Sequence, residues 1–247
     1  MSGHSKWSTI KRKKGVNDAA RAKVFTKLGR EISVAVKEGG QDPNNNSRLR
    51  DLLAKGRAAN VPQDNLMRAV KKAGDGDKNS YEAITYEGYG NGGIAVIVEC
   101  LTDNRNRTAS NMRHYFDKFG GNMGTTGCVS FMFEEKGIIV IEKEYYDEEK
   151  VLEDCFEVGA QDTSFEGEGI IEVTTGVQEL SAVADALEKL GYQITQREPA
   201  MIPNNYTAIS DEDTLKKLAL LFSALDDDDD VQNVWNNLEN QDDLPEV

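Results

Sequence analysis

Cations gather at the amino-terminal end of the sequence, in a pattern suited to binding phosphate groups. They begin with Lys6 beside Trp7, followed by the run Lys11, Arg12, Lys13 and Lys14. Lys and Arg neutralise nucleic-acid phosphates and release counterions, and an indole ring stacks on an unpaired base. The alternative is a solvated tail, with Trp7 packed against protein. We favour binding because the run continues into a basic helix.

That helix is predicted to begin at Asn17 or Asp18 and to end at Gly39-Gly40. Apolar residues recur along it at steps of three and four, which makes one buried face. Cations lie on the opposite face, at Lys23, Lys27, Arg30 and Lys37, and the helix also carries Arg21. We therefore predict a nucleic-acid interface that combines the terminal run with Arg21, Lys23, Lys27 and Arg30.

A second basic site is predicted where a strand meets a helix. Arg105 and Arg107 stand just after Asp103 and Asn104, at the start of a helix expected over residues 105–119. A helix amino terminus attracts anions, and two guanidinium groups strengthen that attraction. The equal alternative is that Asp103 or Asn104 caps the helix while the arginines are exposed or paired.

Charge is divided unequally along the 247 residues, whose net charge is −14. Residues 1–72 carry +11, residues 73–150 carry −6 and residues 151–247 carry −19. A basic segment kept apart from an acidic remainder is typical of a protein with a polyanionic partner. Nucleic acid is therefore the predicted partner, either DNA or ribosomal RNA on the ribosome.

Catalytic and cofactor motifs are missing from the sequence. Its two histidines, His4 and His114, fit no triad or metal spacing, and the three cysteines are expected as free thiols. The glycines of 88–93 and 120–127 do not lie between a strand and a following helix, so they predict turns and not phosphate loops. The acidic run 226–230 is interpreted as a solvated loop, with weak binding of divalent cations as the alternative. We expect no enzyme, cofactor, metal site or small-molecule substrate.

Membrane insertion is not expected, because no apolar run approaches the roughly 20 residues of a membrane span. The first residues lack the apolar core of a secretory signal. A cytoplasmic location is therefore predicted.

The pattern of elements predicts an α+β protein with three domains. Residues 1–76 form a basic domain of three helices, with Gly74–Asp77 as linker. Residues 137–203 follow the β-α-β-β-α-β order of a ferredoxin-like domain. This domain is expected to be inserted into a second one, made of 77–136 plus 204–247. Strands are predicted in the split domain at 93–102, 128–133, 206–209 and 231–236, with a helix at 211–225.

Several motifs together carry a family resemblance. They are Gly3–Trp7, Lys23–Lys27, Arg30–Ile32, Tyr86–Gly90, Glu99–Thr108, Gly120–Asn122 and Asp229–Val234. With them the sequence resembles the YebC family, which is related to the mitochondrial translational activator of cytochrome oxidase. One departure is Asn91, where relatives usually carry proline before Gly-Gly. The resemblance implies one helical and two α+β domains, and it brings no catalytic residues.

The resemblance also implies a cytoplasmic regulator of gene expression. Such proteins are commonly described as transcriptional regulators that bind DNA, while other members resemble translation factors that act where proline-rich sequences stall the ribosome. We therefore expect a non-enzymatic regulator that binds DNA through its basic helical domain. The alternative is an RNA- or ribosome-binding translation factor, because no helix-turn-helix pair with a recognition helix is evident.

Overall fold

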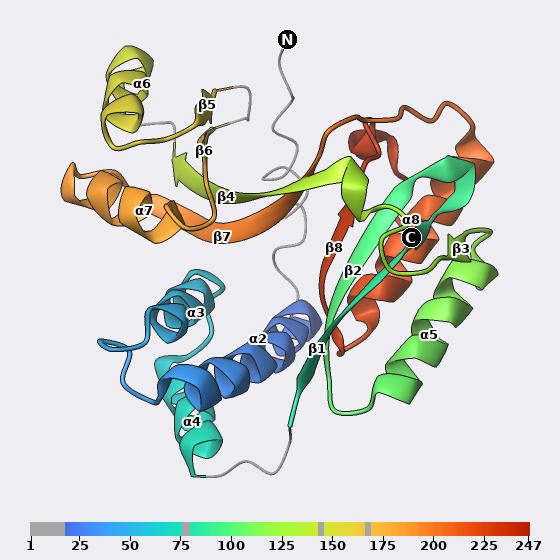
Figure 1. Cartoon of the computed structure of the whole chain (residues 1–247), viewed down its shortest axis with the longest axis horizontal. Coiled ribbons are helices and arrows are strands. Elements are labelled where there is room, and N and C mark those ends of the chain that lie inside the picture. Colours follow the sequence, from blue (N-terminus) through green and yellow to red (C-terminus); the bar gives the residue numbers. More distant parts are fainter. Residues whose placement is uncertain (1–17, 76–79, 143–145, 166–168) are drawn as a thin grey trace. The chain divides into compact units, whose positions relative to one another are not determined.

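The structure is a computed structural model that describes residues 18–75, 80–142, 146–165 and 169–247; of residues 18–22 only the backbone is described. The chain divides into two compact units (Figure 1). Within the described residues, one unit consists of Glu135–Ile202 and the other of Asp18–Glu134 with Pro203–Val247. None of the described helices combines the length and the apolar character needed to cross a bilayer.

Three helices open the larger unit: α2 (Asp18–Gly39), α3 (Ser47–Ala58) and α4 (Gln63–Gly74). Their apolar faces share one core, to which Leu28, Ile32 and Leu49 contribute side chains that are at most 2% exposed. Buried Asn46 links two of the helices. Its Oδ1 accepts the Leu49 N–H at 3.0 Å and caps α3, while its Nδ2 donates to the carbonyl oxygens of Ala35 and Gly40. The three predicted helices are confirmed.

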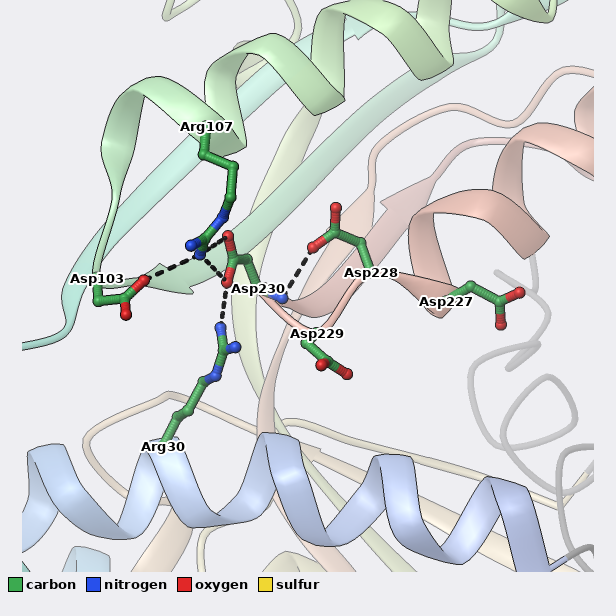
Figure 2. A pocket seen from close by; sticks show the side chains of 7 residues that line it. All are labelled: Arg30, Asp103, Arg107, Asp227, Asp228, Asp229 and Asp230. Carbon is green, nitrogen blue, oxygen red and sulfur yellow. Dashed lines mark hydrogen bonds and ion pairs between the residues drawn. The ribbon is translucent and has the colours of Figure 1, made fainter. Parts of the chain in front are cut away.

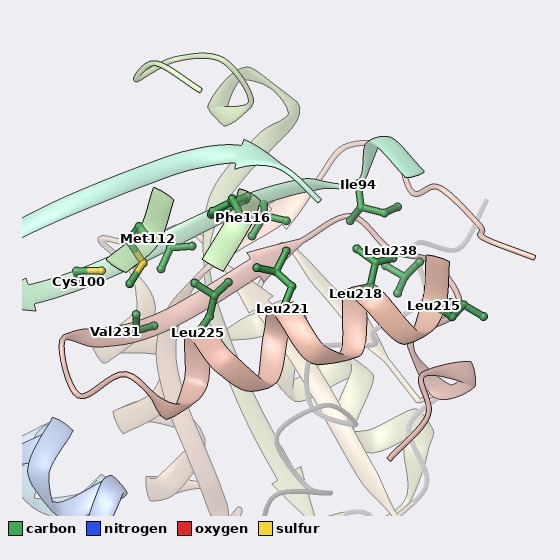
Figure 3. Packing of buried hydrophobic residues seen from close by; sticks show 12 residues of the cluster. Ile94, Cys100, Met112, Phe116, Leu215, Leu218, Leu221, Leu225, Val231 and Leu238 are labelled. Atoms are coloured by element: carbon green, nitrogen blue, oxygen red, sulfur yellow. The ribbon is translucent and has the colours of Figure 1, made fainter. Parts of the chain in front are cut away.

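A four-stranded antiparallel sheet completes this unit, in the order β3-β1-β2-β8. Its strands are β1 (Glu82–Tyr89), β2 (Ala95–Thr102), β3 (Asn122–Met123) and β8 (Val231–Asn236). Helices α5 (Arg105–Lys118) and α8 (Glu212–Asp227) pack against it. Figure 3 shows the shared core, in which Met112 and Phe116 of α5 meet leucines of α8 and residues of β2.

The smaller unit holds the second sheet, in the order β5-β6-β4-β7. Its elements follow one another as β4 (Phe133–Glu142), α6 (Glu148–Glu157), β5 (Asp162–Ser164), β6 (Ile170–Thr175), α7 (Leu180–Lys189) and β7 (Ile194–Pro203). Both helices contribute to one core with β4 and β6. The predicted ferredoxin-like order is confirmed, and the chain is an α+β protein.

Two predicted strands of the split domain were wrong, and strand β1 was missed. Residues 128–133 do not form a strand, because Ser130–Met132 is a 3-10 turn and β4 begins only at Phe133. Residues 206–209 contribute a single bridge, Thr207 to Leu238, and no strand. Strand β1 was not predicted, and it pairs along its whole length with β2. The sequence of β1 does not alternate clearly between apolar and polar residues. Only Glu87 and Gly88 are buried in it, and neither has an apolar side chain.

The glycine-rich segments contain the predicted turns, although Asn122 and Met123 form strand β3 between them. Gly92 and Gly120 have φ of 74° and 77°, a region that side chains with a Cβ rarely adopt. The division into three domains at residues 76, 136 and 203 stays a prediction.

Candidate nucleic-acid interface and the Asp230 cluster

The predicted interface residues are only partly within the described structure. Those that lie outside it are Lys6, Trp7, Lys11, Arg12, Lys13 and Lys14. Arg21 belongs to α2, but its side chain is not among those described. The remaining members are Lys23, Lys27, Arg30, Arg105 and Arg107.

Three cations of α2 contact the acidic run at the end of α8. Lys23 forms an ion pair with Asp227, and Lys27 Nζ donates to the Asp226 carbonyl oxygen at 3.0 Å. Arg30 forms an ion pair with Asp230 and also donates to the Leu101 carbonyl oxygen at 2.8 Å. The basic face of this helix is therefore directed at carboxylates of the same unit.

Asp230 is the centre of this arrangement, and its side chain is only 3% exposed (Figure 2). One nitrogen of Arg107, Nη2, donates to both of its carboxylate oxygens, at 2.9 and 2.8 Å. Thr108 Oγ1 and Thr102 Oγ1 donate to Oδ2 at 2.6 and 3.1 Å. Together with the ion pair to Arg30, these contacts satisfy the buried carboxylate. Left without partners, it would lower the stability of the folded protein. We call Arg30, Thr102, Arg107, Thr108 and Asp230 the Asp230 cluster.

Electrostatics in the cluster follow from this hydrogen bonding. Burial alone raises the pKa of Asp230, but donation from Thr108, Arg107 and Arg30 outweighs burial and lowers the pKa to about 2. The hydrogen bond to Asp230 in turn raises the pKa of Arg107. Asp230 is therefore an anion throughout the physiological pH range.

Local backbone contacts place Asp230 beside the start of α5. Its carbonyl oxygen accepts the Leu101 N–H at 2.8 Å, at an irregularity in the pairing of β2 with β8. Its N–H donates to Asp228, whose side chain accepts bonds from Asn111 and Tyr115 of α5. The acidic run is therefore held to α5 by several hydrogen bonds. Its interpretation as a solvated loop was wrong.

The two arginines at the start of α5 have different surroundings. Asn104 caps the helix by accepting the Arg107 N–H at 3.1 Å, as its sequence position predicted. Arg107 lies in the Asp230 cluster and also pairs with Asp103 at 2.9 Å. Arg105 is 68% exposed and approaches Glu82 at 3.3 Å. Arg105 is thus the more accessible of the two.

Three members of the cluster, Arg30, Arg107 and Asp230, line an open pocket together with Asp103 and the three aspartates 227–229. Carboxylates outnumber guanidinium groups there. In the described part of the chain, however, no three His, Cys, Asp or Glu side chains are placed to hold a metal ion. The pocket's chemistry is therefore ion pairing, in which both arginines already pair with Asp230 and Arg107 also pairs with Asp103.

Other cations of the helical domain point to solvent. Arg57 of α3 and Arg68 and Lys71 of α4 are exposed. They were not singled out from the sequence because they lie outside the amino-terminal run. They add exposed positive charge to the helical domain outside α2.

Glu87 is a second buried carboxylate that sequence reasoning missed. It is 3% exposed and accepts the N–H groups of Gly127, Val129 and Ser130 at 2.8 to 2.9 Å. Burial alone raises its pKa, but these three bonds outweigh burial and lower it. Glu87 thereby holds the glycine-rich loop before β4. Both Glu87 and Asp230 occur in the motifs of the family resemblance, which was the one available signal for them.

Comparison with protein families gives two matches that together cover nearly the whole chain. Residues 5–76 match the TACO1/YebC protein N-terminal domain, and residues 81–238 match the TACO1/YebC second and third domain. The two matched regions therefore include the basic helices and the Asp230 cluster.

Individual relatives agree with these family matches. A protein of Finegoldia magna named "Probable transcriptional regulatory protein" is 52% identical over 98% of this chain and 100% of its own. One of Acetivibrio thermocellus with the same name is 50% identical over 96% and 98%. The crystal structure of a conserved hypothetical protein from Aquifex aeolicus is 44% identical, with a TM-score of 0.85 over 95% of this chain and 97% of that one.

Proposed function

Because the chain belongs to the TACO1/YebC family, we propose that it is a regulator of gene expression that binds nucleic acid, DNA in the first place, through its basic amino-terminal part. The names of its relatives support a role in transcription. The role is one of binding, without a catalytic step. In this proposal Lys6, Lys11, Arg12, Lys13 and Lys14 contact phosphate groups, and Trp7 stacks on a base.

The charge distribution is the observation that carries this proposal. Residues 1–72 have a net charge of +11, whereas the protein as a whole has −14. Phosphate contacts account for much of the affinity of such interfaces. The exposed cations Arg57, Arg68 and Lys71 add to the terminal run, and acidic surfaces elsewhere orient the protein on its ligand.

The cations of α2 and of the start of α5 take part in a different way. Lys23 and Arg30 of α2 and Arg107 of α5 already have carboxylate partners, so they reach a phosphate only by exchanging Asp227 or Asp230 for it. Arg105 has only a weak, exposed pair with Glu82 to give up before it binds a phosphate. Binding by these side chains is therefore weaker than their formal charge suggests.

An RNA- or ribosome-binding translation factor is the second candidate, and one observation favours it. The basic face of α2 meets the acidic run 226–230, so this helix is not presented as a reader of the DNA major groove. Recognition of single-stranded or irregular RNA needs no such helix.

The experiment measures binding of the full-length protein to a DNA duplex and to a ribosomal RNA fragment at several salt concentrations. Replacing Lys11, Arg12, Lys13 and Lys14 with Ala should weaken binding to all sequences alike. On duplex DNA the log–log salt slope should fall by about 0.9 for each phosphate group that the variant no longer neutralises. The control is Lys150→Ala with Lys189→Ala, which changes cations of the acidic smaller unit.

The two ligands separate the candidates. Tighter binding to the duplex at equal salt supports transcription, and tighter binding to the RNA supports translation. An unchanged salt slope in the four-residue variant contradicts the proposed interface.

A further inference from the structure

Helix α6 of the smaller unit exposes two large apolar side chains. Phe156 is 82% exposed and Leu152 is 50% exposed, and their spacing of four residues places them on one side of the helix. Val151 and Cys155, one position earlier in each case, are fully buried in the core of this unit. The helix therefore has a second apolar stripe that its own core does not use.

Acidic residues surround this stripe. Glu148, Glu149, Glu153 and Glu157 of α6 are all exposed, and Lys150 is the one cation among the helix's ten residues. The whole segment 135–202 contains 17 acidic and five basic residues, a net charge of −12. Nucleic acid is repelled from such a surface, so the occupant is not the ligand of the basic helical domain.

One of these acidic residues is poorly placed for the stability of α6 itself. Glu157 lies in the last turn, where the helix dipole disfavours negative charge. No basic residue occupies the last turn to offset it. An exposed Phe beside an unfavourable carboxylate is better explained by a partner than by folding.

We infer that the α6 stripe, Leu152 and Phe156 with Glu149, Glu153 and Glu157, is a docking surface for a basic, partly apolar segment of another protein. Its two apolar side chains insert among apolar residues of that segment, while the glutamates pair with its Lys or Arg at the rim. Proteins that themselves bind nucleic acid carry Lys and Arg clustered on one face or along a helix, which is the charge that this rim requires. The inference does not depend on whether the proposed nucleic-acid ligand is DNA or RNA.

The test uses the full-length protein and a synthetic amphipathic peptide of about 18 residues, roughly five helical turns, built of Leu and Lys. A peptide of the same pattern with Glu in place of Lys is the charge control. Fluorescence anisotropy gives the affinity between about 50 mM and about 200 mM salt. Backbone NMR shifts locate the site. Binding of the Lys peptide with shifts centred on α6 supports the inference.

Two variants sharpen the test. Leu152→Ser with Phe156→Ser should weaken binding about tenfold or more without lowering the melting temperature, because both side chains are exposed. Glu149→Gln with Glu153→Gln should weaken it and flatten its salt dependence. Val177→Ser with Leu190→Ser is the matched control, since both are exposed apolar residues of the same unit outside α6, and it should bind as the parent does.

Three outcomes overturn the inference. The first is equal affinity of the parent and the Leu152→Ser, Phe156→Ser variant, and the second is peptide-induced shifts centred on residues 226–230 instead of α6. The third is self-association in sedimentation velocity that this variant abolishes, because the stripe would then be covered by a second copy of the chain.

Discussion

Arg107 binds both carboxylate oxygens of Asp230 through a single nitrogen, at 2.9 and 2.8 Å, although the two residues lie 123 positions apart. Arg30, 200 positions from Asp230, reaches the same carboxylate from α2. One buried anion thus joins the helical domain, the start of α5 and the start of β8. Removing its charge tests how much these three elements depend on one another.

Asp230→Asn should lower the free energy of unfolding by about 2–4 kcal/mol. The change leaves two arginines facing a neutral amide, and breaking one side of a buried pair is more costly than losing a surface pair. Urea denaturation followed by circular dichroism measures the effect. Asp227→Asn is the control, because its pair with Lys23 is exposed and should contribute less than about 1 kcal/mol. Equal effects of the two substitutions would contradict the central role of Asp230.

Stability should fall in acid in a way that Asp230 controls. Its pKa in the folded protein is about 2, against an ordinary value of 3.8, so it binds a proton more readily when the chain is unfolded. Its contribution is therefore fully present above about pH 4 and is lost as the pH falls toward 2. Unfolding free energies measured at steps from pH 7 to pH 2 should decline less steeply for Asp230→Asn. Parallel curves for the two proteins would contradict the lowered pKa.

Single replacements of the two arginines of α5 should have separate effects. Arg107→Ala removes two bonds to buried Asp230 and should lower stability by about 1–2 kcal/mol, whereas Arg105→Ala should change it by less than about 0.5 kcal/mol. If the arginines also bind a phosphate, Arg105→Ala weakens nucleic-acid binding without a loss of stability. Thermal melts and binding titrations on the same preparations separate these roles. A large loss of melting temperature in Arg105→Ala would show that Arg105 is structural.

Removing the smaller unit should leave a folded remainder. Asn204 N–H donates to the Met132 carbonyl oxygen at 2.8 Å, so the chain leaves the larger unit and returns to it at adjacent points. A short Gly/Ser linker in place of residues 135–202 should therefore close the gap at little cost. The shortened protein should still unfold cooperatively in a thermal melt. Absence of a cooperative transition would contradict the interpretation of this segment as an inserted domain.

Much of the fold could be predicted because its signals are local. The three-residue and four-residue spacing of Phe25, Leu28 and Ile32 predicted α2, and Asn104 was a candidate cap of α5 where the structure places one. Strand β1 was missed for the opposite reason. The buried side chain of β1, Glu87, is polar. The loop before β4, whose N–H groups bind Glu87, is brought to it only by folding. Patterning detects a strand when its own side chains alternate, which β1 lacks.

The candidate site depended more on tertiary structure. By itself, the sequence determined the basic helices, the acidic run 226–230 and the arginines at the start of α5, because composition and spacing are local properties. Only the folded chain decided that Arg30 and Arg107 meet Asp230 and that the basic face of α2 is directed at carboxylates. A charged run has the same sequence whether it is solvated or paired. Which of the two occurs is set by the packing that brings distant residues within a few ångströms of one another.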